Sequence, residues 1–346
     1  MTRLSELGES HVLERILSHN RSGSQVIIGP GDDAAVTAVE GNLVSTADML
    51  VENEDFTRSW LDWRRLGIKA AAQNLSDVCV MGAKPHGLLV SLAVPNSTEI
   101  EDLEALFAGI VAEANRAGDE LGCEIPIIGG DLSSSGLIVI AITALGTVGD
   151  PGVTSAGNGG VITRAGARPG DSIYLAGTIG RAAAGLDLLF ARADGEYGKD
   201  PDDLGADADL RELINTQLAP QPDYAAVAHL GTASAMIDVS DGLSTDLGRV
   251  AAASGVHADI DRASLQELID PLLPAARHLA QKTVTAEELA LSWVLNGGED
   301  HGFLASSAQF GTPPVGWRRI GEMRPGHGVS LDGAPVPTSG FSHFGK

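Results

Sequence analysis

Apolar and polar residues recur along the chain with two different spacings, which predict both helices and strands. Apolar residues three or four positions apart predict helices over residues 4–17, 60–81 and 98–111. Short apolar runs rich in β-branched residues predict strands at 42–46, 86–94, 125–128 and 137–148. Thr98 and Glu101 have the spacing of a capping box, which predicts where the third helix begins. Strands interleaved with long helices are typical of an α/β or α+β domain.

A stretch rich in Gly and Pro at residues 149–171 is the best candidate for a domain boundary. We therefore predict an N-terminal domain over residues 1–150 and a C-terminal domain over 151–346, in keeping with a length of 346 residues. Beyond the boundary, the same patterns predict strands at 172–176, 236–239 and 302–305 and helices at 179–190, 224–230 and from 243 onward. The acidic segment 191–209 is predicted to be a loop without chemistry.

The composition is that of an ordinary globular protein, with 43% hydrophobic and 20% charged residues. Because 46 acids face 23 Lys and Arg, the net charge of -23 argues against nucleic acid and anionic membranes as partners. Cys79 and Cys123 stand beside aliphatic residues, which predicts buried thiols rather than a disulfide. Residues 1–17 do not have the pattern of a signal peptide, and no apolar run approaches the roughly 20 residues of a membrane span. We expect a cytoplasmic protein.

Acidic residues that directly follow apolar runs and small residues are the main chemical signal. Asp32 and Asp33 stand together on a glycine turn, where two carboxylates repel each other in a dry site unless a cation lies between them. The same arrangement recurs at Asp48, Asp77, Asp131, Asp241 and the pair Glu299 and Asp300. One such turn is most simply a solvated turn. Six of them favour a shared pocket for several metal ions, and carboxylates suit Mg²⁺ and, through it, a nucleotide triphosphate.

A polar stripe on the helix predicted at 60–81 supports the same chemistry. Gln73, Asn74 and Asp77 are three or four residues apart and therefore share one face of an otherwise apolar helix. A metal or phosphate site explains the stripe, and so does a hydrogen-bonded contact between domains or subunits. The sequence contains no P-loop, no dinucleotide fingerprint opening a helix and no nucleophile elbow.

Seven motifs follow one another over nearly the whole chain. They are Gly-Asp-Asp-Ala at 31–34, Ser-Thr-Ala-Asp-Met-Leu-Val at 45–51, Asn-Leu-Ser-Asp-Val-Cys-Val-Met-Gly-Ala-Lys-Pro at 74–85, Ile-Gly-Gly-Asp at 128–131, Arg-Ala-Gly-Ala-Arg-Pro-Gly-Asp at 164–171, Asp-Val-Ser-Asp-Gly-Leu at 238–243 and Asn-Gly-Gly-Glu-Asp at 296–300. In this order they resemble the thiamine-monophosphate kinase family, part of the aminoimidazole ribonucleotide synthetase-like superfamily.

The resemblance implies a two-domain α/β (α+β) fold. The N-terminal domain would carry the metal and nucleotide sites and dimerise through its sheet, and the C-terminal α/β domain would cover nucleotide and substrate. The implied activity is ATP-dependent phosphorylation of thiamine monophosphate to thiamine diphosphate, by direct in-line transfer assisted by several Mg²⁺ ions. We therefore expect a cytoplasmic homodimer with ATP as co-substrate; whether K⁺ is also required stays open.

Carried over residue by residue, the resemblance implies specific roles. The implied Mg²⁺ ligands are Asp33, Thr46, Asp48, Asp77, Asp131, Asp238 and Asp241. The positions that match nucleotide contacts are Gly130, Asp131, Arg164 and Ser240. The positions that match substrate contacts are Asp55, Glu299 and Phe341. No acid or base is assigned, because the resemblance implies that the metal ligands Asp33, Asp77 and Asp131 carry the chemistry.

Three positions depart from the family pattern. Ala47 separates Ser-Thr from Asp48, Asp55 replaces a common His, and His301 stands where a Tyr often follows Glu-Asp. Two other functions remain open: another ATP-using member of the superfamily such as aminoimidazole ribonucleotide synthetase, or a non-catalytic divalent-metal-binding protein. Arg164 in a glycine-rich segment and the polar stripe favour the enzyme, since metal storage needs neither.

Overall fold

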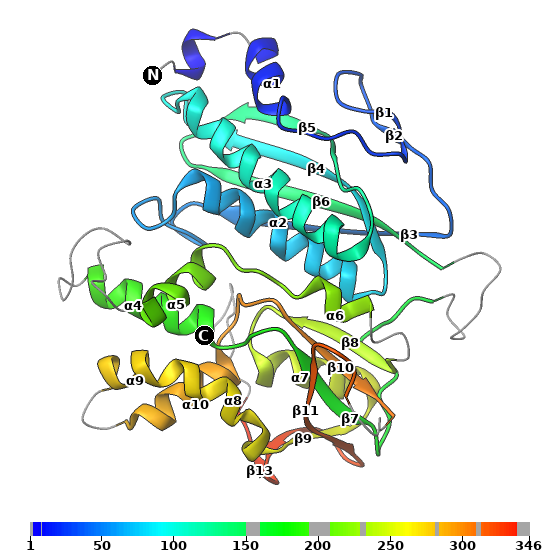
Figure 1. Cartoon of the computed structure of the whole chain (residues 1–346), viewed down its shortest axis with the longest axis vertical. Helices are drawn as coiled ribbons and strands as arrows, with labels where there is room; N and C mark the ends of the chain where they lie inside the picture. Colours follow the sequence, from blue (N-terminus) through cyan, green and yellow to red (C-terminus); the bar gives the residue numbers. More distant parts are fainter. Residues whose placement is uncertain are drawn as a thin grey trace. The chain divides into compact units, whose positions relative to one another are not determined.

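The chain folds as two compact units, Met1–Val161 and Ile162–Lys346 (Figure 1). The computed structural model describes residues 3–7, 9–149, 160–193, 208–228, 233–280, 284–308 and 313–337. Each unit combines a β-sheet with helices, so the predicted mixture of helices and strands in two domains is confirmed. Within the described ranges, no helix is long and apolar enough to cross a membrane.

A four-stranded sheet forms the centre of the first unit. Its strands are β3 (Asn42–Val51), β6 (Val139–Val148), β4 (Lys84–Val94) and β5 (Ile127–Ser134), in that order. The pairs β3–β6 and β6–β4 are antiparallel, whereas β4–β5 is parallel. A separate ribbon joins β1 (Val26–Ile28) to β2 (Val36–Thr37), and η1 (Leu4–Glu6) and α1 (Glu9–Leu17) precede it.

Two long helices cover one face of this sheet. Figure 1 shows α2 (Trp63–Val80) and α3 (Ile100–Leu121) lying across the same side of the strands. In β6 every second residue from Ile140 to Val148 is buried, whereas the residues between them are only half-buried. Because successive strand residues point to opposite faces, the helices cover one face and leave the other open.

Paired glycines let α2 and α3 approach backbone to backbone. A Cβ on Gly67 would collide with the Leu106 carbonyl oxygen, and a Cβ on Gly109 would collide with the Arg64 carbonyl oxygen. The two contacts are reciprocal across the helix crossing, so neither position has room for a side chain.

The second unit is built on a seven-stranded sheet. Its order is β13 (Ala334–Pro335), β12 (Gly328–Leu331), β9 (His257–Ile260), β11 (Trp317–Arg324), β7 (Ser172–Ala176), β10 (Gly302–Ser307) and β8 (Ala235–Val239). Its helices are α4 (Arg181–Ala193), α5 (Ala208–Leu218), α6 (Tyr224–Ala228), α7 (Leu243–Ser254), η3 (Arg262–Leu265), α8 (Gln266–Ile269), η4 (Asp270–Leu272), α9 (Leu273–Leu279) and α10 (Ala286–Asn296). Every residue of β7 and β10 is buried, as expected for central strands, and every residue of the edge strand β8 is buried as well.

Several local predictions were wrong at element ends. Asp48 lies inside β3, because pairing with β6 continues as far as Val51. The residues 129–131 belong to β5 rather than to a turn, because they pair with β4. The capping box is absent: the N-cap of α3 is Glu99, without a side-chain hydrogen bond, and Thr98 is buried. The opening helix is interrupted between η1 and α1 by extended backbone at Leu7.

Both cysteines are free, as predicted, but only one of them is fully buried. Burial raises the pKa of the Cys79 thiol, which keeps it protonated. Cys123 is partly exposed, so the prediction of two buried thiols was wrong for this residue.

The glycine crossing predicts that Gly109→Ala destabilises the protein. The added methyl group has no space beside the Arg64 carbonyl, so we expect the free energy of unfolding to fall by about 1–3 kcal/mol. Urea unfolding followed by circular dichroism measures the change. The matched control is Gly136→Ala, where a Cβ meets no atom within 4 Å. Equal stability of the two variants would contradict the backbone-to-backbone crossing.

Candidate active site

The polar stripe of α2 contacts the edge strand β3. The Thr46 hydroxyl donates to a carboxylate oxygen of Asp77 over 2.8 Å. One residue pair further along, the Asp48 backbone N–H donates to the side-chain oxygen of Asn74 over 2.9 Å. Asn74 is fully buried and donates in turn to the Ala70 carbonyl. The stripe is therefore a hydrogen-bonded contact within one unit, and it brings Thr46, Asp48 and Asp77 together on the helix-covered face.

Asp131 lies on the other face of the same sheet. It pairs with Ser91 of β4, which pairs with Ala141 of β6, and both neighbours are among the residues that the helices leave uncovered. Thr46 instead pairs with the buried Ala144. Since paired strand residues point to the same face, the sheet separates Asp131 from the three residues at the β3 edge.

Asp33 and Asp55 occupy turns of the first unit. Asp33 is exposed, and its backbone N–H donates to the Asp32 carboxylate over 2.8 Å. The Asp55 carboxylate accepts from the Val51 backbone N–H over 2.7 Å, which ties it to its own turn after β3. Gly130, beside Asp131, has a φ of 158°, and a Cβ there would collide with the Val90 carbonyl oxygen. Only glycine allows this close strand contact.

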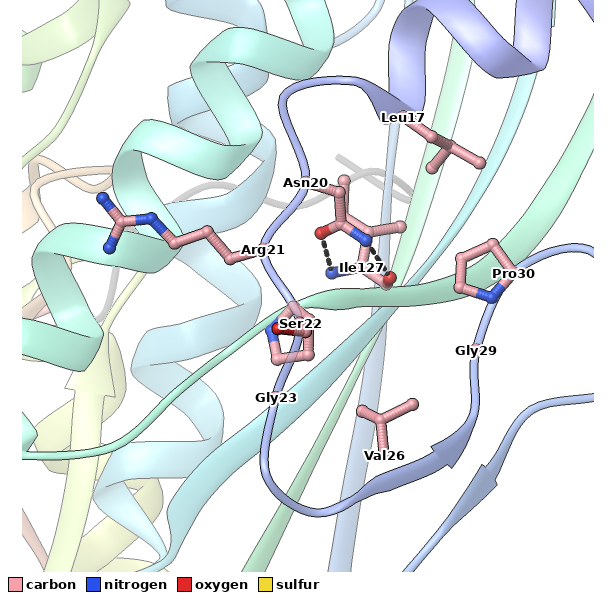
Figure 2. Close-up of a pocket in the computed structure, with 10 residues that line it drawn as sticks. Leu17, Asn20, Arg21, Ser22, Gly23, Val26, Gly29, Pro30 and Ile127 are labelled. Carbon is pink, nitrogen blue, oxygen red and sulfur yellow. Dashed lines mark hydrogen bonds between the residues drawn. The ribbon is translucent and has the colours of Figure 1, made fainter.

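A cavity of about 390 Å³ lies between the loop 20–30 and the start of β5 (Figure 2). The Asn20 side chain makes two hydrogen bonds with the backbone of Ile127, one in each direction, and so fixes the loop to the strand edge. Pro30 leads into the turn that carries Asp33, and Ile127 begins the strand that carries Gly130 and Asp131. The cavity therefore adjoins two segments that sequence analysis associates with metal and nucleotide.

In the second unit, two turns at the ends of neighbouring strands come together. Ser240 follows β8, Glu299 precedes β10, and these strands pair side by side. The Glu299 backbone N–H donates to the Ser240 carbonyl over 2.9 Å. A Cβ on Gly298 would collide with that same carbonyl, so the Gly-Gly of the motif permits the close approach.

Asp246 stabilises the turn that carries Asp241, and sequence analysis missed it. Its fully buried carboxylate accepts from the backbone N–H groups of Asp241 and Gly242 over 3.0 and 3.2 Å. Arg249 pairs with Asp246 and with Asp241, each over 2.6 Å. Burial raises the pKa of Asp246 to about 6. The acid and the Arg three residues later on one helix were the signal that could have revealed this network.

Asp300 stabilises the second turn in a similar way. Its carboxylate is buried and accepts from the Thr178 hydroxyl over 3.0 Å and from the backbone N–H groups of Arg181 and Ala182 over 3.2 and 2.9 Å. The last two groups begin α4, so Asp300 caps this helix from a distant part of the sequence. Burial raises the pKa of Asp300 to about 6.

The residues on either side of Asp300 face different partners. Glu299 and His301 both have left-handed backbone, with φ of 68° and 53°. Glu299 accepts a hydrogen bond from the Gln217 side-chain nitrogen over 2.5 Å. His301 Nδ1 lies 3.2 Å from a carboxylate oxygen of Asp238, and both side chains are buried. The His that departs from the family pattern thus contacts an implied metal ligand.

Two predicted site residues remain, Arg164 and Phe341. Arg164 is exposed, and its carbonyl accepts from the Ser254 hydroxyl over 3.1 Å. Phe341 lies outside the described residues. Among the residues that the structure does describe, no three His, Cys, Asp or Glu side chains are grouped closely enough to hold a metal ion.

Comparison with known proteins decides the family. Residues 31–148 match the model of the AIR synthase related protein N-terminal domain, and residues 168–331 match that of the C-terminal domain. A thiamine-monophosphate kinase of Mycobacterium tuberculosis is 37% identical over 349 residues, covering 99% of this chain and 93% of the relative. The chain belongs to the thiamine-monophosphate kinase family.

Solved structures of this family share the fold over nearly the whole chain. The thiamine-monophosphate kinase of Stenotrophomonas maltophilia K279a has a TM-score of 0.76 and 30% identity, covering 95% of this chain and 98% of that one. The structure of AaThiL complexed with AMPPCP and TMP has a TM-score of 0.71 and 28% identity, covering 99% of both chains. The predicted membership of the thiamine-monophosphate kinase family and the predicted fold are confirmed.

The burial of Asp300 predicts a pH-dependent stability that Asp300→Asn removes. The folded-state pKa of about 6 lies above the ordinary Asp value near 4, so the neutral carboxyl group favours the folded state at low pH. This contribution is fully present below about pH 4 and is lost as the pH rises towards 6. The difference in unfolding free energy between wild type and variant should fall by up to about 1.4 kcal/mol per pH unit in this window. Urea unfolding between pH 4 and 8 measures it, and a constant difference would contradict the assignment.

Proposed function

We propose that this protein transfers the γ-phosphoryl group of ATP to thiamine monophosphate and so forms thiamine diphosphate. The observation that carries the proposal is the match over 99% of both chains to AaThiL, whose structure is described as a complex with AMPPCP and TMP. AMPPCP is an ATP analogue, so that relative binds a nucleotide and a second phosphate compound together. The identity of 37% to the kinase of Mycobacterium tuberculosis extends over the same length.

The donors at the β3 edge fit a hard divalent cation. The Thr46 hydroxyl and the Asp77 carboxylate are in contact, and Asp48 follows Thr46 by two residues on the same face of β3. Oxygen donors of this kind are those that Mg²⁺ prefers. Thr46, Asp48 and Asp77 would hold one such ion. The other acids implied by family resemblance, Asp33, Asp131, Asp238 and Asp241, would serve as ligands of further Mg²⁺ ions. Bound Mg²⁺ would neutralise phosphate oxygens and favour direct in-line transfer.

The residues of the two turns in the second unit have distinct roles in this proposal. Glu299 would bind the cationic thiazolium or the aminopyrimidine donor of the substrate, and Gln217 orients its carboxylate from α5. Asp55 and Phe341 are the other proposed substrate contacts. Gly130, Asp131, Arg164 and Ser240 would contact the nucleotide, and no residue is assigned as a general base. The reaction can proceed without one, because positioning and charge neutralisation dominate phosphoryl transfer.

The open face of the four-stranded sheet supports a homodimer. It presents mainly small and apolar residues, including Leu43 and Met49, each 56% exposed, and the half-buried Ala141 and Leu145. An exposed apolar sheet face of this kind marks an interaction surface. We infer that a second copy of the chain covers it, so that the N-terminal domain forms the dimer and the C-terminal domain covers the ligands. The dependence on ATP and the free cysteines support a place in the cytoplasm.

Direct assay tests the activity. Purified protein with Mg²⁺, ATP and thiamine monophosphate should form thiamine diphosphate and ADP in equal amounts, and chelation of the metal by EDTA should stop the reaction. Asp77→Asn should lower turnover by more than about 100-fold, since even outer-shell groups of a metal site contribute about 10–100-fold. Chromatographic separation of the thiamine phosphates measures both results.

The matched control for Asp77→Asn is Asp261→Asn. Asp261 caps η3 through the Ala263 backbone N–H over 3.0 Å and belongs to none of the proposed sites. We expect it to keep near wild-type turnover, with both variants showing native circular dichroism. Formation of no thiamine diphosphate by the wild type would favour another ATP-using activity of the superfamily or a binding protein.

The open sheet face predicts that Ala141→Arg yields a monomer. Arginine at the centre of β6 would place a long charged side chain in the contact between copies, where desolvation is costly. Light scattering after size-exclusion chromatography measures the mass. The control is Val315→Arg in the second unit, where the side chain is already 77% exposed and the dimer should persist. A wild type that elutes as a monomer would contradict this inference.

A further inference from the structure

The turn at residues 299–301 combines three unusual features. Two residues without glycine's freedom, Glu299 and His301, have left-handed backbone on either side of Asp300. Asp300 itself is only 2% exposed, although it carries a carboxylate. Glu299, the residue that would meet the substrate, makes its side-chain hydrogen bond to Gln217 of α5, far away in the sequence. Backbone in this conformation persists only where surrounding contacts fix it.

We propose that Asp300 is a positioning residue for the substrate-binding carboxylate of Glu299. This inference rests on the proposed function, and it concerns a residue that would touch neither substrate nor nucleotide. Through Asp300, the turn is fixed to Thr178 and to the first N–H groups of α4. The left-handed conformation at Glu299 is then maintained, and the Glu299 carboxylate is held against Gln217.

The donors around Asp300 explain why a carboxylate is required there. Each oxygen is satisfied: one accepts from Thr178 and Arg181, and the other accepts from Ala182. All three partners donate, so a side chain with two acceptor oxygens is the one that matches them. Asparagine would present an N–H group to a donor and would lose at least one of these hydrogen bonds.

The backbone of Glu299 provides a second connection. Its N–H donates to the Ser240 carbonyl, and the Gly298 position leaves no space for a Cβ beside that carbonyl. A shift of the turn therefore moves Glu299 relative to both Gln217 and Ser240. If Asp300 acts through Glu299, its loss should weaken binding of thiamine monophosphate much more than binding of ATP.

A double-mutant cycle with Asp300→Asn and Glu299→Gln tests the proposal. We expect Asp300→Asn to raise KM for thiamine monophosphate by about 10-fold or more, which is the effect of removing a group that orients a binding side chain. KM for ATP should stay within about 2-fold of the wild-type value. In the double variant, kcat/KM should be close to that of Glu299→Gln alone. The reason is that Asp300 acts through the Glu299 carboxylate, which Glu299→Gln has already removed. Additive effects, or equal increases of both KM values, would overturn the proposal.

Two further variants distinguish a positioning role of Asp300 from a general loss of folding. Thr178→Ala removes one of the three donors to Asp300 and should change KM in the same direction by a smaller factor. Asp261→Asn removes a capping carboxylate elsewhere in the same unit and should change neither KM. No change in KM for thiamine monophosphate with Thr178→Ala and Asp300→Asn would overturn the proposal.

Hydrogen exchange separates a failure of this inference from a failure of the proposed function. A wild type that makes no thiamine diphosphate overturns the function, whereas the backbone amides of residues 299–301 report on the turn without turnover. In Asp300→Asn these amides should exchange at least about 10-fold faster than in wild type, and in Asp261→Asn they should not change. Unchanged exchange in Asp300→Asn would overturn the positioning role.

Discussion

Buried carboxylates satisfied by backbone N–H groups are the interaction on which the second unit depends. Asp246 accepts from the turn after β8, and Asp300 accepts from the first turn of α4. A buried charge without such partners is strongly unfavourable, so each carboxylate fixes the backbone around it. The two turns then contact each other through Glu299 and Ser240, which gives the acid-bearing segments one defined arrangement.

The first unit differs from the second, because its acidic residues lie on both faces of one sheet. Thr46, Asp48 and Asp77 are brought together by the polar stripe of α2, and the close crossing of α2 and α3 at Gly67 and Gly109 keeps that helix pair compact over the sheet. Asp131 faces the other side. The same sheet therefore has the hydrogen-bonded donors Thr46 and Asp77 on one face, and Asp131 together with a largely apolar surface on the other.

Family membership indicates the type of reaction, and the local structure shows which residues hold the implied site residues in place. Similarity over nearly the full length to thiamine-monophosphate kinases favours transfer of a phosphoryl group from ATP. Within this framework, Gln217, Asp246 and Asp300 are residues that support the implied ligands without belonging to them. His301, which departs from the family pattern, contacts Asp238, so the departure lies beside an implied metal ligand rather than on a distant surface.

The sequence alone predicted the family, the candidate residues and many of the helices and strands, because periodicity and short motifs are local properties of the chain. It did not predict α5, α10, β9, β11 or β12. It predicted β7 over residues 172–176, and it predicted that Gln73, Asn74 and Asp77 share a helix face. The tertiary structure decided the rest: β3 continues through Asp48 because β6 pairs with it, and Asp131 faces away from Asp77 because of the sheet register. Asp300 and Gln217 meet their partners across long sequence separations, and no local pattern records such contacts.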